Sequence, residues 1–235
     1  MTRTFFVTGT NTEVGKTYIT AALLHAAAGR GLKTAAVKPV ASGCEQTPEG
    51  LRNSDALTLI AAMSEDLPYE QVNPIALEPA VAPHIAAMEA GKRLDASRLV
   101  GICRGVMSGK ADLVLIEGAG GWRVPLTPRQ FLSDLPRELG LPVILVVNME
   151  LGCINHALLT AEAVHRDGLT LAGWVANFAR GPQEEMPRAE ENLMTLRALL
   201  PAPCLGVVPF DPGADSRNGA ANLDLSPLLS ASEES

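Results

Sequence analysis

The feature that most constrains the fold of this chain is a glycine-bearing loop near its start, Gly9–Thr17, which reads Gly-Thr-Asn-Thr-Glu-Val-Gly-Lys-Thr. The apolar run Phe5-Phe6-Val7 comes just before this loop, and the helix-like segment Tyr18–Leu24 follows it. Strand, loop ending in Gly-Lys-Thr and helix, in that order, are typical of a phosphate-binding loop. Backbone N–H groups of such a loop bind anions. Lys16 can reach the outer phosphates, and the Thr17 hydroxyl can ligate magnesium.

The loop departs from the usual pattern at one position. Gly9 and Gly15 enclose five residues instead of four, so Thr10 stands where the first glycine is expected. The alternative interpretation is an ordinary turn before a helix that happens to contain Gly-Lys-Thr.

Short apolar runs alternate with helical patterns along the rest of the chain, which predicts an α/β fold. The strand candidates are Thr4–Thr8, Thr34–Lys38, Leu113–Glu117, Val143–Asn148, Leu171–Asn177 and Cys204–Val208. The helix candidates are Lys16–Ala28, Ser54–Ala62, His84–Ala90, Ser97–Met107, Arg129–Leu139, His156–Arg166 and Glu184–Leu199. Several strands are nearly continuous in Val, Ile and Leu, as parallel strands covered on both faces are. We therefore expect an open, mostly parallel sheet with helices on both faces.

One domain is expected over residues 1–225, with a frayed tail at 226–235. The proline-rich segment Pro68–Pro83 is expected to be an irregular loop over the end of the sheet.

Composition excludes several classes of function. The formal net charge of −7, from 19 basic and 26 acidic residues, argues against a general nucleic-acid binder. The longest uncharged apolar stretch, Leu141–Met149, is too short to span a bilayer, and no secretory signal follows Arg3. A cytoplasmic protein without a membrane partner is expected. The cysteines form no Cys-x-x-Cys pair and the histidines show no metal-ligand spacing, so reduced thiols and no zinc site are expected.

Polar residues close most of the predicted strands: Thr8, Lys38, Glu117, Asn148 and Asn177. Ligands of open α/β sheets bind beyond the carboxyl ends of the strands. These residues are therefore candidates for a binding site.

Two of these strand ends carry charge that suits a nucleotide. Glu117 is followed by Gly118-Ala119-Gly120-Gly121, and a carboxylate there could hold magnesium facing the phosphate loop; the alternative is a carboxylate on a solvated turn. Lys38 precedes Pro39, which ends the strand. A second lysine near the phosphates would neutralise charge that develops during phosphoryl transfer, although a lysine at a strand end is more often a solvated surface charge.

Three further residues are ambiguous from spacing. Asp55 lies at the start of a helix, where capping and the helix dipole alone favour aspartate. Asn177 could pair with an adenine edge or simply end a strand. Asn148 lies where a guanine-specific protein would carry Asn-Lys-x-Asp, but the lysine and aspartate are missing.

Together these segments resemble the dethiobiotin synthetase family of biotin synthesis. The matching segments run in the family's order over about residues 4–209: Thr8–Thr17, Lys38–Gly43, Asn53–Leu57, Glu117–Trp122 with Pro125, Gly152–His156 and Gly173–Asn177. The altered first glycine is normal in this family. The match fades after Pro209, so nucleotide contacts from the last segment are not implied.

The resemblance implies a P-loop fold and ATP-dependent carboxylation of 7,8-diaminononanoate by CO2 or bicarbonate. In this reaction a carbamate attacks the γ-phosphorus of ATP, and the resulting carbamic–phosphoric anhydride closes a cyclic urea. It also implies Mg2+ and a homodimer, in which the substrate carboxylate reaches the partner subunit.

The resemblance also implies a role for each matching residue. Lys16 and Lys38 would be catalytic, and Thr17, Asp55 and Glu117 would ligate magnesium. The ATP-binding set would be Glu13, Val14, Gly15, Lys16, Thr17, Tyr18, Asp55, Glu117, Gly118, Ala119, Gly120, Asn177 and Phe178. The substrate-binding set would be Thr12, Ser42, Cys153, Ile154 and Asn155.

Two other functions are open from the sequence. A related amide-forming synthetase would usually need a glutaminase module, for which 235 residues leave no room. A switch ATPase of the chromosome- or septum-positioning kind would carry a second signature lysine early in the loop, where this chain has Thr10-Asn11-Thr12.

Overall fold

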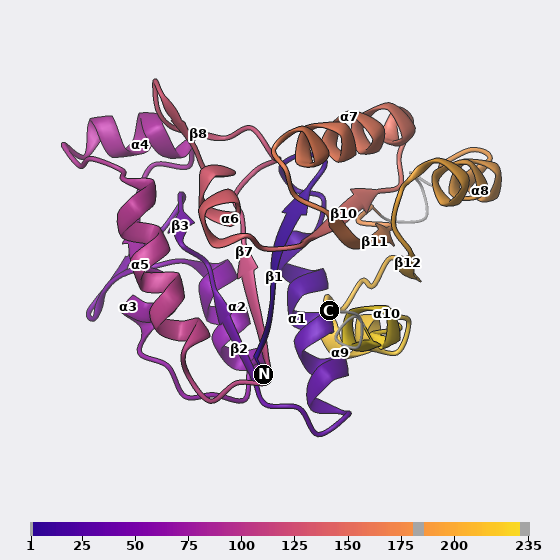
Figure 1. Ribbon diagram of the computed structural model, residues 1–235. Coiled ribbons are helices and arrows are strands. Elements are labelled where there is room, and N and C mark those ends of the chain that lie inside the picture. Colours follow the sequence, from indigo (N-terminus) through magenta and orange to yellow (C-terminus); the bar gives the residue numbers. More distant parts are fainter. Residues whose placement is uncertain (1, 181–185, 231–235) are drawn as a thin grey trace.

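A six-stranded parallel sheet forms the centre of the computed structural model, which describes residues 2–180 and 186–230 (Figure 1). Its strands are β1 (Arg3–Gly9), β2 (Thr34–Val37), β7 (Leu113–Glu117), β10 (Val143–Asn148), β11 (Leu171–Asn177) and β12 (Cys204–Val208). They lie in the order β12-β11-β10-β1-β7-β2. β1 is therefore internal, and β7 separates it from the edge strand β2.

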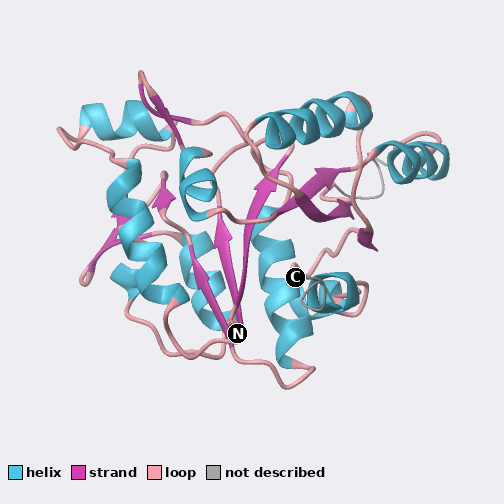
Figure 2. Cartoon of the chain, in the orientation of Figure 1, coloured by secondary structure: helices cyan, strands magenta, loops and turns pink. Residues whose placement is uncertain are grey.

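Helices cover both faces of this sheet (Figure 2). The helices of one face are α1 (Lys16–Ala28), α2 (Ser54–Ala62), α9 (Ser216–Ala220) and α10 (Ser226–Ser230). Those of the other face are α4 (Pro83–Glu89), α5 (Ala96–Met107), α6 (Asp134–Leu139), α7 (Cys153–Arg166) and α8 (Ala189–Leu199). The two-layer cover explains why the strands are apolar on both sides.

The strand β7 shows how the sequence produces this layering. Leu113 and Leu115 lie in the core beneath α1 and α2, whereas Val114 and Ile116 lie in the core beneath α5 and α6. Successive side chains of a strand point to opposite faces. A strand with both faces covered is therefore apolar along its length, and Glu117 at the end of β7 is an exception that is itself buried.

The smaller elements lie near the ends of the sheet. They are α3 (Tyr69–Val72) and the strand pairs β3 (Val40–Ala41) with β6 (Ile75–Ala76), β4 (Glu45–Thr47) with β5 (Gly50–Arg52), and β8 (Pro125–Thr127) with β9 (Gln130–Phe131).

The predicted open parallel sheet with helices on both faces is confirmed, and each of its six strands was predicted to within two residues. The helices predicted at Lys16–Ala28 and Ser54–Ala62 are present with those bounds. The segment Pro68–Pro83 is not irregular throughout, since it contains α3 and β6.

Three helix and tail predictions need correction. The helix expected over Arg129–Leu139 is wrong in its first half, where β9 pairs with β8 before α6 begins at Asp134. Of the helix expected over Glu184–Leu199, the first two residues lie outside the described residues, and α8 begins only at Ala189. The tail expected to be frayed from Ser226 instead forms α10 as far as Ser230, because Leu228 is buried against the α1 layer; residues 231–235 lie outside the described part.

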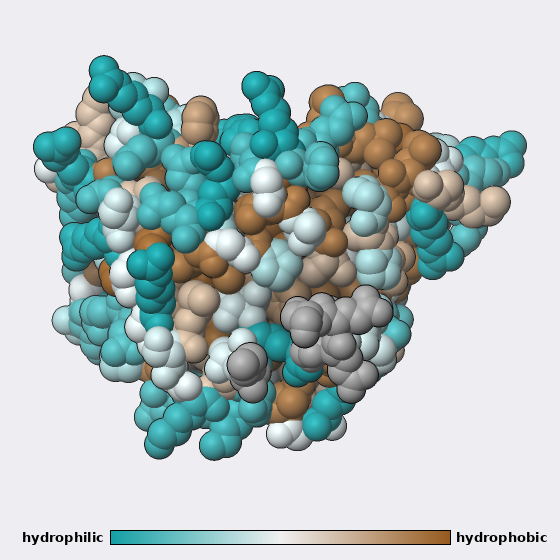
Figure 3. All heavy atoms as spheres, viewed as in Figure 1, coloured by the Kyte–Doolittle hydropathy of each residue, from teal (hydrophilic) through white to brown (hydrophobic). Residues whose placement is uncertain are grey.

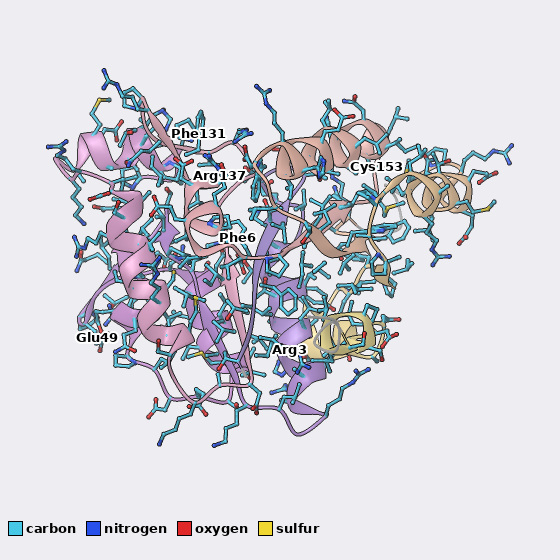
Figure 4. The ribbon with its side chains drawn as sticks, in the orientation of Figure 1. Arg3, Phe6, Glu49, Phe131, Arg137 and Cys153 are labelled. Carbon is cyan, nitrogen blue, oxygen red and sulfur yellow. The ribbon has the colours of Figure 1, made fainter. Side chains whose placement is uncertain are left out.

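Three side-chain contacts hold the chain that follows β7 against the body of the fold. Phe6, which lies in the interior (Figure 4), meets the Trp122 ring edge to face at 6.0 Å. The Trp122 indole N–H donates to Asp167 at 2.8 Å, and Arg123 makes a two-point contact with the same carboxylate at 2.7 and 2.9 Å. The end of the glycine turn at Trp122 is thereby held in place.

Among residues 2–180 and 186–230, none of the helices combines the length and apolar character that crossing a membrane requires. All four cysteines are free thiols.

Candidate active site

Strand order brings three sequence-distant groups to one edge of the sheet. The glycine loop follows β1, Glu117 ends β7, and Lys38 follows β2. Since β7 lies between β1 and β2, Glu117 lies between the loop and Lys38. The polar strand ends singled out in the sequence are therefore neighbours in space.

The loop wraps around the N-terminus of α1. Gly15 has a φ of +83° at the N-cap position, a conformation that L side chains rarely adopt. Lys16 Nζ donates to the Asn11 carbonyl at 3.0 Å, which folds this side chain back over the loop. The Asn177 amide, 3% exposed, donates to the Val14 carbonyl at 2.9 Å and supports the loop from below. The result is a helix N-terminus with a lysine above it, which suits a phosphate group.

Lys38 and Glu117 form a buried ion pair, with Nζ and Oε1 2.6 Å apart and 4% and 0% of the residues exposed. Lys38 Nζ also lies 2.9 Å from Asp55 Oδ2, at the start of α2. The Thr17 hydroxyl donates to Glu117 Oε1 at 2.7 Å. Four residues from the ends of β2 and β7 and the starts of α1 and α2 therefore meet at one point.

The charges of this cluster are set by the balance of burial and ion pairing. Burial alone would lower the pKa of Lys38, but the Glu117 and Asp55 carboxylates raise it above its ordinary value, so the ammonium stays charged. Burial raises the pKa of Asp55, but Lys38, Thr17 and Lys16 together lower it below its ordinary value. Burial, together with the nearby Lys38 charge, lowers the pKa of Lys16 to about 8. Lys16 thus lacks a full negative partner and is suited to receive an anion.

Magnesium fits the oxygen atoms of this cluster. No group of three or more His, Cys, Asp or Glu side chains able to hold a metal occurs in the described part of the chain. Thr17, Asp55 and Glu117 nevertheless offer a hydroxyl and two carboxylates, and magnesium usually takes only one or two carboxylates, with phosphates and water as its other ligands. Glu117 Oε2 is buried and makes no hydrogen bond to the described residues. A buried carboxylate oxygen without a partner is costly, and a cation would satisfy it.

A cavity of about 670 Å³ opens beside the cluster. Its lining includes Thr12, Glu13, Gly15, Lys16, Thr17, Tyr18, Lys38, Ser42, Asp55, Ala119 and Gly120 from the predicted set. One wall is largely apolar and comes from Ala41, Ala80–Pro83 and Val124. The Ser42 hydroxyl is buried at this wall without a hydrogen-bond partner in the described residues. The cavity therefore combines a charged floor with an apolar side that carries one free hydroxyl.

Several residues predicted for the site do not line this cavity. Val14, Glu117, Gly118, Asn177 and Phe178 lie beneath or beside it. Asn177, predicted to pair with adenine, uses its amide N–H on the loop; its contact with a nucleobase stays a prediction.

Cys153, Ile154 and Asn155 also lie away from the cavity. They form the first turn of α7, where Cys153 is labelled in Figure 4. The prediction that they meet a substrate concerns the partner subunit, so the geometry of one chain does not test it.

Sequence reasoning missed Asn53 and the wall Ala80–Pro83. Asn53 lines the cavity and caps α2 by accepting from the Ala56 N–H at 3.2 Å. Its signal was an asparagine directly before a helix. The only sequence signal for the wall was the proline-rich composition of the segment that contains it.

Comparison with known proteins identifies a matching family model and close relatives of the whole chain. A family model described as an AAA domain matches residues 3–218. The ATP-dependent dethiobiotin synthetase BioD of Pseudomonas paraeruginosa is 62% identical over 95% of this chain and 97% of its own length. Proteins of the same name from Marinobacter nauticus and Cellvibrio japonicus are 56% and 55% identical over 96% and 97% of this chain.

Solved structures support the fold. The septum site-determining protein MinD of Pyrococcus horikoshii, complexed with Mg-ADP, aligns with a TM-score of 0.58 over 100% of this chain and 90% of that chain, at 20% identity. The cell division ATPase MinD of Pyrococcus furiosus aligns at 0.53, again with 20% identity, over 100% of this chain and 93% of that chain. Likeness at this identity shows a shared fold alone, whereas 55–62% identity over nearly the whole chain shows descent within one family. The chain belongs to the ATP-dependent dethiobiotin synthetase family.

Proposed function

We propose that this protein converts 7,8-diaminononanoate, CO2 and ATP into dethiobiotin, ADP and phosphate. The observation that carries the proposal is the buried Lys38–Glu117 pair, 2.6 Å apart, beside a phosphate-binding loop in a chain 62% identical to a dethiobiotin synthetase. A charged lysine fixed next to the phosphate site suits a reaction in which negative charge builds up on transferring oxygens.

The reaction runs in three steps in this site. One substrate amine takes up CO2 and loses a proton, giving a carbamate. A carbamate oxygen attacks the γ-phosphorus, the bond to the β-phosphate oxygen breaks, and ADP leaves. The second amine then attacks the carbamate carbon and loses a proton, the bond from that carbon to the phosphate oxygen breaks, and the ring closes as phosphate leaves with the bonding electrons.

Lys16 and Lys38 stabilise the charge of these steps. Lys16 belongs to the loop and meets the outer phosphates, while Lys38, on the far side of Glu117, meets the carbamate and γ-phosphate oxygens. Two fixed cations beside the transferring group need no rearrangement as charge develops, and such preorganisation is the main source of catalysis in phosphoryl transfer.

Thr17, Asp55 and Glu117 hold magnesium together with the nucleotide phosphates. The bound cation neutralises phosphate charge. It would also give Glu117 Oε2 the partner that this buried oxygen lacks among the described residues.

The cavity wall receives the diamine. Its apolar residues, among them Val81 and Val124, suit an alkyl chain, while Thr12 and the unpartnered Ser42 hydroxyl suit the carbamate head. Closing such a site around the intermediate keeps water from hydrolysing the anhydride.

A homodimer completes the substrate site. Leu151, 90% exposed, and Leu159, 56% exposed, lie just before and on α7, and Figure 3 shows a hydrophobic area over this helix. Exposed apolar side chains gathered on one element indicate an interaction surface. In a dimer packed through this surface, the first turn of α7, Cys153–Asn155, of one subunit lies near the substrate bound to the other subunit. The N–H groups of this turn can then receive the substrate carboxylate.

Mass measurement by sedimentation or light scattering tests the dimer. Wild type is expected at twice the monomer mass, and Leu151→Asp is expected to dissociate because the charge cannot be buried in an apolar interface. Met88→Asp, which charges another exposed apolar residue on the distant α4, is the matched control and should leave the mass unchanged. A wild type that is monomeric at assay concentration would contradict the dimer.

The activity itself is tested by ADP release with magnesium, diaminononanoate and bicarbonate, combined with the mass of the product. Release is expected only when diamine and bicarbonate are both present, because the carbamate formed from them is the nucleophile. ATP hydrolysis indifferent to the diamine but stimulated by DNA or vesicles would instead favour a switch ATPase.

A further inference from the structure

The Tyr69 hydroxyl joins two parts of the site without lining the cavity. Tyr69 begins α3, and its hydroxyl accepts from the Asn53 N–H at 2.8 Å and donates to the Asn73 side-chain carbonyl at 3.0 Å. The bond donated to Asn73 needs a protonated phenol, and burial raises the pKa of Tyr69. One neutral hydroxyl therefore connects the end of β5 with the end of α3.

Asn73 carries this connection to Lys38. Asn73 is 3% exposed, and its Nδ2 donates to the Lys38 carbonyl at 2.7 Å. The Lys38 N–H donates to the Val72 carbonyl, also at 2.7 Å. Lys38 follows the last residue of β2 and precedes Pro39, which has no N–H to extend a ladder. The Lys38 backbone is thus held by α3 and the residue after it, beyond the end of β2.

Asn53 carries the connection to Asp55. Asn53 caps α2, and Asp55 lies two residues further on, in the first turn of that helix. The Asn53 side chain also donates to the Ser42 carbonyl at 3.3 Å. The orientation of the helix start, and with it the Asp55 carboxylate 2.9 Å from Lys38 Nζ, depends on how Asn53 is held.

The Tyr69 ring itself is fixed from its face. The Arg52 guanidinium lies 4.1 Å from the ring centroid, and it also lies 3.6 Å from Glu70. A cation stacked on an aromatic face restricts the ring. The hydroxyl is therefore aimed by contacts on both its ring and its oxygen.

We propose that Tyr69 is a positioning residue that sets the distance between Lys38 and Asp55, and so the geometry of the charged cluster around the phosphates. The roles of Lys38 and Asp55 rest on the proposed function. Tyr69 itself touches neither nucleotide nor substrate, since neither it nor Asn73 lines the cavity.

Tyr69→Phe tests this inference because it removes only the hydroxyl. The kcat for ring closure is expected to fall about 10- to 100-fold, the scale of a displacement near 1 Å in a catalytic group. The KM for ATP should change little, because the loop around α1 is untouched. Calorimetry should show unchanged ADP affinity without magnesium and a smaller gain in affinity when magnesium is added, because Asp55 is no longer held.

Thr34→Val is the matched control. Thr34 begins β2, at the opposite end from Lys38, is 0% exposed, and accepts from the Ser64 N–H at 3.0 Å. Its loss removes the hydrogen bond from Ser64, whereas Tyr69→Phe removes two, so a fall in thermal stability is expected here with kcat and magnesium dependence unchanged. Equal kinetic losses in the two variants would show a purely structural role and overturn the inference.

Asn73→Ala tests the connection from Tyr69 to Lys38 separately from the connection to Asp55. It also replaces Tyr69→Phe as the test if that variant does not fold. It cuts the contact with Lys38 but leaves the Asn53 N–H bonded to Tyr69, so kcat should fall while the effect of magnesium on ADP affinity is retained. A wild-type kcat in both Tyr69→Phe and Asn73→Ala would refute the positioning role. A wild-type protein that forms no dethiobiotin would refute the proposed function instead. In that case the positioning role of Tyr69 would still be decided by comparing the magnesium dependence of ADP binding in Tyr69→Phe and Thr34→Val.

Discussion

Lys38→Met is expected to lower kcat for ring closure by about 10²–10³-fold, the usual effect of losing one preorganised donor to developing charge. Methionine keeps most of the length of the side chain and removes the ammonium. The KM for ATP should change much less, because Lys16 and the backbone of the loop still hold the phosphates. Steady-state rates of ADP release with saturating diamine and bicarbonate measure both quantities.

The matched control for this prediction is Lys33→Met. Lys33 comes just before β2 and is exposed, so the same substitution is made at the far end of the same strand. Wild-type kinetics are expected for this variant. If Lys38→Met also turned over at the wild-type rate, Lys38 would have no part in the chemistry.

Loss of activity by unfolding must be separated from loss of chemistry. Lys38→Met leaves Glu117 buried without its nearest cation, and breaking a buried pair in this way costs about 3–5 kcal/mol of folding free energy. The double variant Lys38→Met with Glu117→Gln removes both charges and should regain much of that stability in urea unfolding. It should not regain turnover, because neither the ammonium nor the carboxylate that we propose to bind magnesium returns.

The parts of the fold that could be predicted are those whose signal is local. The apolar run of β7 predicts a strand covered on both faces, and the Gly-Lys-Thr after β1 predicts a loop that begins a helix. Lys38 and Glu117 could be named as candidates because both close strands. Their contact could not be deduced, since it depends on β7 lying between β1 and β2, an order that neither sequence pattern contains.

The elements that were missed depend on contacts between distant segments. The first half of Arg129–Leu139 has a helical pattern, yet β9 pairs with β8 there, and tertiary pairing overrides weak local propensity. α10 forms because Leu228 reaches the core beneath α1. Spacing alone does not distinguish Asp55 from an ordinary residue of a first helical turn; only the family resemblance gave it a role, and its carboxylate lies 2.9 Å from Lys38 Nζ. The Tyr69 bridge spans 16 residues to Asn53 and has no sequence signature.

Gly15→Ala is expected to weaken ATP and ADP binding by at least about 100-fold, which corresponds to about 2.7 kcal/mol. Gly15 has a φ of +83°, and a Cβ there would lie 2.2 Å from Asn177 Nδ2. The Asn177 side chain is 3% exposed and bonded to Val14, so it has little room to withdraw. The loop must move instead, and its N–H groups then no longer converge on the phosphates.

Gly31→Ala is the matched control, because it imposes the same backbone strain without the collision. Gly31 has a φ of +79°, lies beyond the other end of α1, and has open space where a Cβ would stand. A left-handed alanine costs about 1–2 kcal/mol, so both variants should lose that much stability in urea unfolding. Only Gly15→Ala should lose nucleotide affinity in calorimetry. Equal affinity in the two variants would mean that the loop tolerates a Cβ at Gly15, and that contact between Asn177 and Val14 does not set the shape of the phosphate site.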